Sequence, residues 1–232
     1  MSSSGTGYGT AFTAWRAAAP DWDAYTRHAF VEGLRDGTLP RAAFLHYLAQ
    51  DYVFLKHFSR AWALAIVKAD TLPEMEAATA TVHGLLHYEM GLHVKICAEA
   101  GIDAETLAAT PEHPGNMAYT RYVLEAGYSG DFLDLLAALA PCVLGYGEIG
   151  ARLAAEATSD TYGDWIGTYA GDDYQGICRD VGALIDGALT HRLGPDYATL
   201  PRFAMLSARF AQATTLEVGF WDMGLSPSSA PA

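Results

Sequence analysis

The chain has 232 residues, of which 51% are hydrophobic and 18% are charged, and its formal net charge is −13. Its lysines and arginines number only 14 and are scattered, so no basic stripe is available for nucleic-acid phosphates. This balance argues against a nucleic-acid partner and suits one large, heavily buried domain.

The cysteine pattern and the lack of targeting signals bear on the compartment. No apolar run reaches the ~20 residues of a membrane span, and the polar start lacks the regions of a signal peptide. Cys97, Cys142 and Cys178 form no CxxC pair, which favours reduced thiols over disulfides or a zinc site. We therefore expect a cytoplasmic protein that makes no membrane contact.

The residue pattern predicts an all-α fold. Ala, Leu, Met, Glu and Arg dominate, and no strand-length run alternates with a period of two. Thr71, followed by Pro73 and Glu74, has the character of a helix start. We expect a single domain over residues 1–225 and a disordered tail over 226–232, since the tail is small, polar and interrupted by proline. The breaks at proline and glycine divide the domain into helices at roughly 9–26, 28–35, 41–69, 73–100, 115–128, 131–157, 173–193 and 198–224.

One helical stretch carries a thiol and a phenol on the same face. Cys142 and Tyr146 are four residues apart in an Ala/Leu-rich segment, which is about one helical turn. A cysteine in this setting is commonly a small buried hydrophobe. The alternative is a nucleophile with a hydrogen-bonding neighbour.

Two acidic residues interrupt apolar helix faces. Asp51 lies between Tyr47 and Phe54 on one stripe, and Glu217 shares a face with Trp221. Asp51 is either a buried acid tied to a neighbouring helix or a carboxylate that faces a cavity, because an isolated buried charge is costly. Glu217 is either a surface residue or an acid whose neutral form is favoured by its apolar surroundings, as a general acid requires.

Aromatic residues in apolar segments indicate a flat pocket. Tyr119 and Tyr169 taken singly are core residues, but as a group such phenols can line a pocket in which a planar heterocycle stacks.

A histidine-rich segment offers a rival site. His83 and His87, and likewise Glu89 and His93, are four residues apart, a spacing that can bind a metal on a helix. The two pairs do not share a face, and no second Glu-x-x-His motif occurs; Glu148, near Cys142, is a further candidate carboxylate ligand. We favour a surface histidine cluster and a Glu–His packing pair, and we assign no metal ligand.

Four segments in order resemble the TenA/thiaminase II family, an all-helical family related in fold to haem oxygenase. The resemblance covers about residues 10–225 and rests on residues 28–40, 47–52, 141–146 and 217–223. It implies hydrolysis of aminomethyl-aminopyrimidine to hydroxymethyl-pyrimidine in thiamin salvage, and in some members cleavage of thiamin. It also implies a helical bundle of the haem-oxygenase type, a homotetramer and no cofactor.

The same resemblance implies a role for individual residues. Cys142 would be the nucleophile that adds to the pyrimidine ring, and Glu217 would act as acid to the leaving amine and then as base to water. Asp51 would hold the ring's amino group and the adjacent ring nitrogen. The remaining substrate-binding residues would be Tyr146, which orients the thiol region, and Tyr119, Tyr169, Phe54 and Tyr47. Some relatives carry a tyrosine where this chain has Phe54.

Two other functions remain open from sequence. One is a metal-dependent oxidase that uses the His83–His93 region with Glu148. The other is a protein that binds thiamin or its pyrimidine, or a regulator, without catalysis.

Overall fold

The structure is a computed structural model that describes residues 7–226, and within them it contains helices and no strand. The all-α fold predicted from the sequence is therefore confirmed. The helices are α1 (Thr10–Ala18), α2 (Trp22–Thr26), α3 (Ala29–Asp36), α4 (Arg41–Lys68), α5 (Leu72–Gly84), the π-helical turn η1 (Leu85–Glu89), α6 (Met90–Glu99), α7 (Ala104–Ala108), α8 (Pro114–Ser129), α9 (Phe132–Glu156), α10 (Gly163–Ala170), α11 (Asp172–Leu193), the 3₁₀ turn η2 (Tyr197–Thr199) and α12 (Pro201–Leu225).

The long helices match the predicted ranges, and the differences fall at breaks and short elements. The segment 9–26 is two helices, because Pro20 separates α1 from α2. The helix predicted at 73–100 contains the π-helical turn at 85–89, which hydrophobic spacing does not reveal. The short helices α7 and α10 were not predicted. Apart from Ser226, the tail predicted to be disordered lies outside the described residues.

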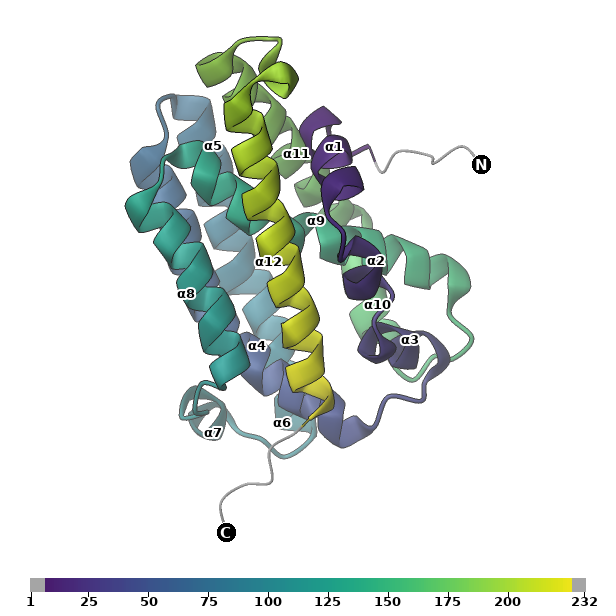
Figure 1. The fold of residues 1–232 in the computed structure, drawn as a ribbon. Coiled ribbons are helices and arrows are strands. Elements are labelled where there is room, and N and C mark those ends of the chain that lie inside the picture. The colour runs from purple at the N-terminus through teal and green to yellow at the C-terminus, as the bar shows by residue number, and fades with distance from the viewer. Residues whose placement is uncertain (1–6, 227–232) are drawn as a thin grey trace.

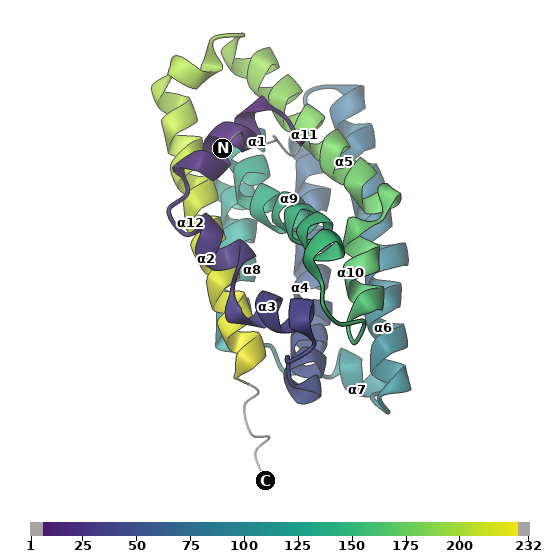
Figure 2. The same ribbon diagram turned by 90° about the vertical axis from the view of Figure 1, so that its right-hand side faces the viewer.

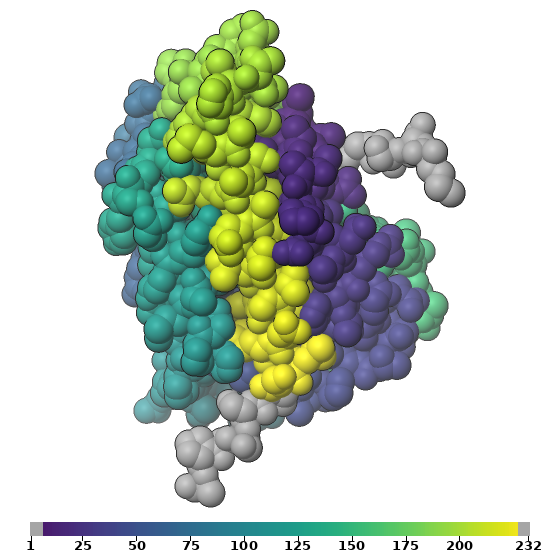
Figure 3. All heavy atoms as spheres, viewed as in Figure 1, coloured from purple at the N-terminus to yellow at the C-terminus, as the bar shows by residue number. Residues whose placement is uncertain are grey.

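Helix α9 runs through the middle of the molecule, between α8 and α12 on one side and α10 and α11 on another (Figures 1 and 2). Helix α12 lies between α8 and the N-terminal helices on the face shown in Figure 3. Helix α4 packs against α5, α6, α8 and α12, so it reaches the same interior as α9. Residues from α4, α8, α9, α10 and α12 therefore converge on one region of the core.

Helix α9 corrects one expectation from the sequence. At 25 residues and a mean hydropathy of 1.5 it is long and apolar enough to cross a membrane, which we did not expect. Its apolar stretch is 89% buried inside the protein, however, so its composition is that of a core helix. The capping box of Asp131 and Asp134 fixes where it begins.

Two glycines of α9 allow neighbouring helices to approach closely. A Cβ on Gly145 would lie 2.3 Å from Tyr25 Cε1 of α2. A Cβ on Gly150 would lie 2.5 Å from the backbone carbon of Tyr169 in α10. The absence of a side chain at Gly145 therefore lets α2 approach α9. The absence of a side chain at Gly150 lets α10, which carries Tyr169, approach the same helix, which carries Cys142.

Candidate active site

A pocket of about 960 Å³ opens beside Cys142. Helices α4, α5, α6, α9, α10 and α11 and the turn η1 contribute its walls, and Phe58, Glu89, Tyr169 and Tyr174 lie with Cys142 on its lining. Cys142 is partly exposed, whereas Cys97 and Cys178 are buried. Among the three cysteines, Cys142 is therefore the one whose thiol a small molecule in this pocket can reach.

Asp51 lies deeper than Cys142, held by two hydrogen bonds. Its residue is 3% exposed. His93 Nε2 of α6 lies 2.6 Å from Asp51 Oδ2, and the Tyr47 hydroxyl donates to the same oxygen at 3.2 Å. Asp51 is therefore a buried acid tied to a neighbouring helix, the first of the two alternatives, and it does not line the pocket beside Cys142.

Glu217 is buried in the same region, with 1% of its surface exposed, so the surface alternative for this residue is wrong. The Tyr119 hydroxyl of α8 donates to Glu217 Oε1 at 2.8 Å. Burial raises the pKa of Glu217 to about 8, although the Tyr119 hydrogen bond works in the opposite direction. At neutral pH the carboxyl therefore holds its proton, as its apolar sequence context predicted.

The eight predicted site residues lie in one region of the core, where Phe220 packs on both Tyr47 and Phe54, but only Cys142 and Tyr169 line the open pocket. Tyr47 Oη lies 3.5 Å from Tyr146 Oη, and the Tyr146 ring centroid lies 5.1 Å from that of Tyr169. Phe54 packs on Tyr119 with ring centroids 5.0 Å apart. The other six residues are buried and form an inner layer of four aromatic rings and two acids: Tyr47, Phe54, Tyr119, Tyr146, Asp51 and Glu217.

A third acid stands at the pocket wall. Tyr169 donates a 2.8 Å hydrogen bond to Glu89 Oε1. Burial and the nearby charge of Asp51 raise the pKa of Glu89 to about 7, against the lowering effects of His93 and Tyr169. Burial, and then the charges of Glu217, Glu89 and Asp51, raise the pKa of the Cys142 thiol well above its usual value. The thiol is thus neutral in the free protein and needs a base before it can attack.

Residues 15–226 match the family described as TENA/THI-4/PQQC. The chain belongs to this family. A relative from Halalkalibacterium halodurans, named aminopyrimidine aminohydrolase, is 34% identical over 90% of this chain and 92% of its own length. The family that four sequence segments indicated is therefore confirmed.

Solved structures of TenA proteins agree with this assignment. A crystal structure described as a TenA family transcription regulator from Silicibacter sp. TM1040 is 65% identical, with a TM-score of 0.94 over 95% of this chain and 98% of that one. A domain with a haem oxygenase-like fold from Shewanella denitrificans has a TM-score of 0.66 at 16% identity, over 92% of this chain and 90% of that one. At that identity the likeness shows the fold alone, and it confirms the predicted haem-oxygenase-like bundle.

Sequence reasoning missed part of this TenA site. Glu89 and His93 were interpreted as a packing pair, yet Glu89 lines the pocket and His93 bonds to Asp51. Their spacing of four residues was the available signal. What the sequence did not show is the π-helical turn that ends at Glu89 and the approach of α6 to α4.

The side chains considered for a metal site are engaged elsewhere. Glu148 accepts hydrogen bonds from Arg16 at 2.8 Å and Trp22 at 3.2 Å, and His93 is paired with Asp51. His83 and His87 both line the pocket, with ring centroids 4.5 Å apart and ring planes tilted by 38°. Within residues 7–226, no three His, Cys, Asp or Glu side chains are grouped so as to hold one metal ion.

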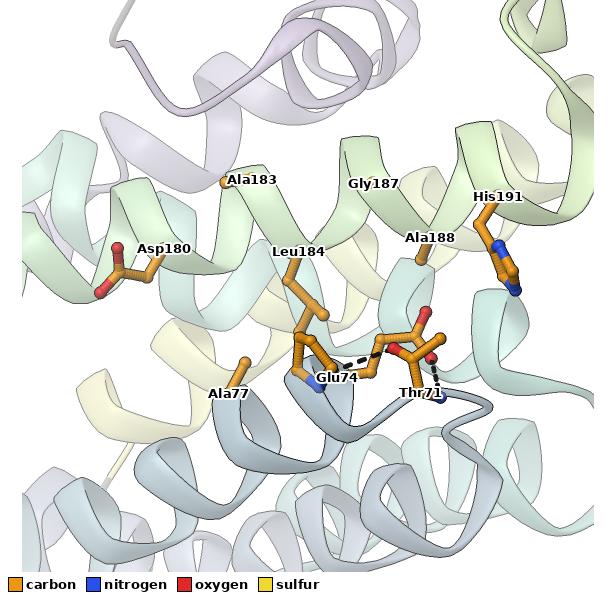
Figure 4. Close-up of a pocket in the computed structure, with 10 residues that line it drawn as sticks. Thr71, Glu74, Ala77, Asp180, Ala183, Leu184, Gly187, Ala188 and His191 are labelled. Atoms are coloured by element: carbon orange, nitrogen blue, oxygen red, sulfur yellow. Dashed lines mark hydrogen bonds between the residues drawn. The ribbon is translucent and has the colours of Figure 1, made fainter.

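A second hollow, of about 350 Å³, lies between α5 and α11 and away from Cys142 (Figure 4). Glu74 stands in it, joined to Thr71 by the reciprocal hydrogen bonds of a capping box. Arg192 also binds both oxygens of Glu74, at 2.5 and 3.0 Å. This acid therefore holds the start of α5 and the end of α11 together, and the helix start predicted at Thr71 is confirmed.

Proposed function

We propose that this protein hydrolyses aminomethyl-aminopyrimidine to hydroxymethyl-aminopyrimidine and ammonia, in the salvage of the thiamin pyrimidine. The prediction that the chain is an enzyme is confirmed, because several relatives that it matches over most of its length are named aminopyrimidine aminohydrolase. The observation that carries the proposal is a partly exposed thiol on a pocket, with three acids around it that are paired with phenols and an imidazole.

The inner aromatic layer suits a planar ring. Aromatic faces such as those of Phe54, Tyr146 and Tyr169 stack on a heterocycle with little conformational cost. Asp51 is the group placed to bind the amino group and the neighbouring ring nitrogen. Among the residues that the structure describes, no hydrogen bond involves its Oδ1, whereas Oδ2 is held by His93 and Tyr47.

The first half of the proposed reaction releases the amine. Cys142 Sγ adds to the ring carbon next to the one that carries the aminomethyl arm, while Glu217, in the minor fraction of molecules in which it is ionised, takes the thiol proton. The ring electrons move to the nitrogen held by Asp51 and then return to form an exocyclic C=CH₂ bond, which breaks the C–N bond. Glu217 gives its proton to the departing amine, which leaves as ammonia.

The second half restores the enzyme. Water adds to the exocyclic carbon and loses a proton to Glu217, the ring electrons shift back, and the C–S bond breaks. Glu217 then returns the proton to the thiolate of Cys142. A carboxyl with a pKa of about 8 suits this exchange, because it is mostly protonated at neutral pH while about one molecule in ten carries the ionised form.

Thiamin is a second candidate substrate. The pocket of about 960 Å³ lies at the upper end of the range for small-molecule sites, so it has room for more than a pyrimidine. The addition and elimination are the same, but the thiazole leaves as a neutral base that takes no proton. Glu217 therefore passes the thiol proton to solvent before it accepts a proton from the attacking water.

Chromatography of the products tests the proposed function. Purified protein is incubated with aminomethyl-aminopyrimidine or with thiamin, and hydroxymethyl-aminopyrimidine is quantified. We expect product from the wild type, none from Cys142→Ala, and undiminished product from Cys97→Ala, a buried cysteine that does not line the pocket. Binding of either compound without turnover would instead favour a non-catalytic binder, and equal rates for both variants would remove Cys142 from the mechanism.

We further propose a homo-oligomer, a tetramer by resemblance to the family, located in the cytoplasm. Two large apolar side chains near the junction of α4 and α5 support an interface, since Val67 is 78% and Leu72 is 66% exposed. Sedimentation of the protein as a monomer would contradict this proposal.

A further inference from the structure

His93 is a fully buried imidazole with both ring nitrogens engaged. It is 0% exposed, on α6, where α6 packs against α4, η1 and α7. Nδ1 lies 2.7 Å from the backbone carbonyl oxygen of Glu89, and Nε2 lies 2.6 Å from Asp51 Oδ2. The ring is therefore fixed between two oxygen atoms on opposite sides.

These two contacts set the number of protons that the pair holds. A backbone carbonyl oxygen only accepts hydrogen bonds, so Nδ1 must carry a proton. The 2.6 Å contact between Nε2 and Oδ2 requires a second proton, which belongs either to the imidazole or to the carboxyl. His93 and Asp51 thus share one proton beyond the fixed one on Nδ1, and the pair has no net charge.

We propose that His93 supplies, through Asp51, the proton that activates the pyrimidine ring, an inference that rests on the proposed function. An aminopyrimidine offers a hydrogen-bond donor, its amino group, beside an acceptor, its ring nitrogen. A bare carboxylate matches only the donor. A carboxyl that can take the proton it shares with His93 matches both the amino donor and the ring-nitrogen acceptor.

The proton follows a balanced path. The Nε2 proton of His93 passes to Asp51 Oδ2. Rotation of the carboxyl then turns this O–H toward the substrate, and the same proton passes from Oδ2 to the ring nitrogen beside the amino group. The protonated ring accepts the electron pair that moves when Cys142 Sγ adds, so no ring anion forms. When the ring electrons shift back at the end of the reaction, the ring nitrogen returns the proton to Asp51 and His93. No proton is consumed.

The groups around His93 favour this arrangement. Asp51 and Tyr47 of α4 and Glu89 of η1 are the titratable groups nearest the ring, whereas Glu105 of α7 is exposed to solvent. Burial alone would lower the pKa of His93, but the hydrogen bond and charge of Asp51 and the charge of Glu89 outweigh it and raise the pKa. His93 acts through Asp51, so it is a positioning residue that holds the proton which Asp51 transfers to the ring.

Nitrogen NMR of histidine-labelled protein tests the proton count without a substrate. We expect the His93 signals, assigned by their loss in His93→Gln, to show a proton on Nδ1 and a shared proton on Nε2 at neutral pH. An Nδ1 without a proton would overturn the proposal.

Ultraviolet spectroscopy of bound hydroxymethyl-aminopyrimidine, the reaction product, tests the proton transfer. The spectrum of an aminopyrimidine changes when its ring nitrogen is protonated, and the free compound in acid supplies the reference. We expect the wild type to bind the compound with the acid-type spectrum and His93→Gln to bind it with the neutral spectrum. Tyr47→Phe removes the other hydrogen bond to Oδ2 and should weaken binding while it keeps the acid-type spectrum.

A kinetic measurement separates this proposal from the proposed function. We expect His93→Gln to lower kcat about 10²- to 10³-fold with a smaller change in KM, as for loss of a general acid. Acid-type binding without any product from the wild type would support the role of His93 and refute the hydrolase. Product formed by His93→Gln at the wild-type rate would support the hydrolase and refute the role of His93.

Asp51→Asn keeps the proposal testable if His93→Gln does not fold. The amide cannot share the proton, so we expect the neutral spectrum. An acid-type spectrum in this variant, or no acid-type spectrum in the wild type whether or not the compound binds, would overturn the proposal.

Discussion

The acids at the α5–α11 end of the molecule differ from those around Cys142 in their partners. Arg192 binds Glu74, and Arg202 and Arg209 bind Asp134. The Arg192 hydrogen bonds lower the pKa of Glu74, and at Asp134 the arginines outweigh the opposing effect of burial. Around Cys142, by contrast, Glu217 is bonded to Tyr119 and Glu89 to Tyr169.

Burial raises the pKa of Glu217 and Glu89, and no arginine offsets this effect. The pKa values of Glu217 and Glu89 rise to about 8 and about 7, mainly because of burial. Glu74 and Asp134, which are paired with arginines, stay charged and join helices. An acid without a cation exchanges protons near neutral pH, which is a requirement of acid–base catalysis. Glu74 and Asp134 therefore join helices as charged groups, whereas Glu217 and Glu89 have the raised pKa that the proposed acid–base chemistry requires.

The largest expected effect is on catalysis. Glu217→Gln should lower kcat for aminomethyl-aminopyrimidine by about 10³-fold, because the amide cannot move the proton between thiol, amine and water. Glu74→Gln is the matched control. It should retain kcat and lose about 1–3 kcal/mol of stability in urea unfolding, because it weakens a charged hydrogen bond. Similar kcat losses in both variants would erase the distinction between the two kinds of acid.

The second effect is on stability as a function of pH. Glu217 keeps its proton in the folded state up to about pH 8, whereas its ordinary value is 4.5. The folded protein thus binds more protons than the unfolded chain between these values, so its free energy of unfolding falls as the pH rises. We expect Glu217 to account for a loss of about 3–5 kcal/mol across this window, and Glu89 to add a further loss up to about pH 7.

Urea unfolding of Glu217→Gln from pH 4.5 to 8 measures this contribution. The variant should lose much less stability than the wild type, most clearly between pH 7 and 8, where Glu89 contributes little. Parallel curves for the two proteins would mean that Glu217 is ionised in the folded state.

The smallest expected effect concerns the glycine that lets α10 approach α9. Gly150→Ala places a Cβ against the Tyr169 backbone and should cost about 1–3 kcal/mol of stability while it displaces Tyr169. Gly187→Ala in α11, where a Cβ meets no atom within 4 Å, should stabilise the protein by about 0.5–1 kcal/mol. A Gly150→Ala variant as stable as the wild type, with unchanged KM, would show that this approach does not position Tyr169.

Helix periodicity explains why the fold could be predicted from the sequence to this extent. The stripe of Tyr47, Asp51 and Phe54 and the pair of Cys142 and Tyr146 depend on the helix repeat alone, so these groupings were visible. Contacts between helices could not be predicted from this repeat. The bond from His93 to Asp51 joins α6 to α4, and Glu89 reaches the pocket from a π-helical turn. Both depend on tertiary packing, which no local pattern encodes.

The protonation state of the inner acids is the central claim, and infrared difference spectroscopy measures it directly. The C=O stretch of a protonated carboxylic acid is resolved from that of a carboxylate, so spectra of wild type minus Glu217→Gln and wild type minus Glu74→Gln are compared at pH 7. We predict a protonated-acid band that disappears in Glu217→Gln and is unchanged in Glu74→Gln. A wild-type spectrum without that band at pH 7 would contradict the account.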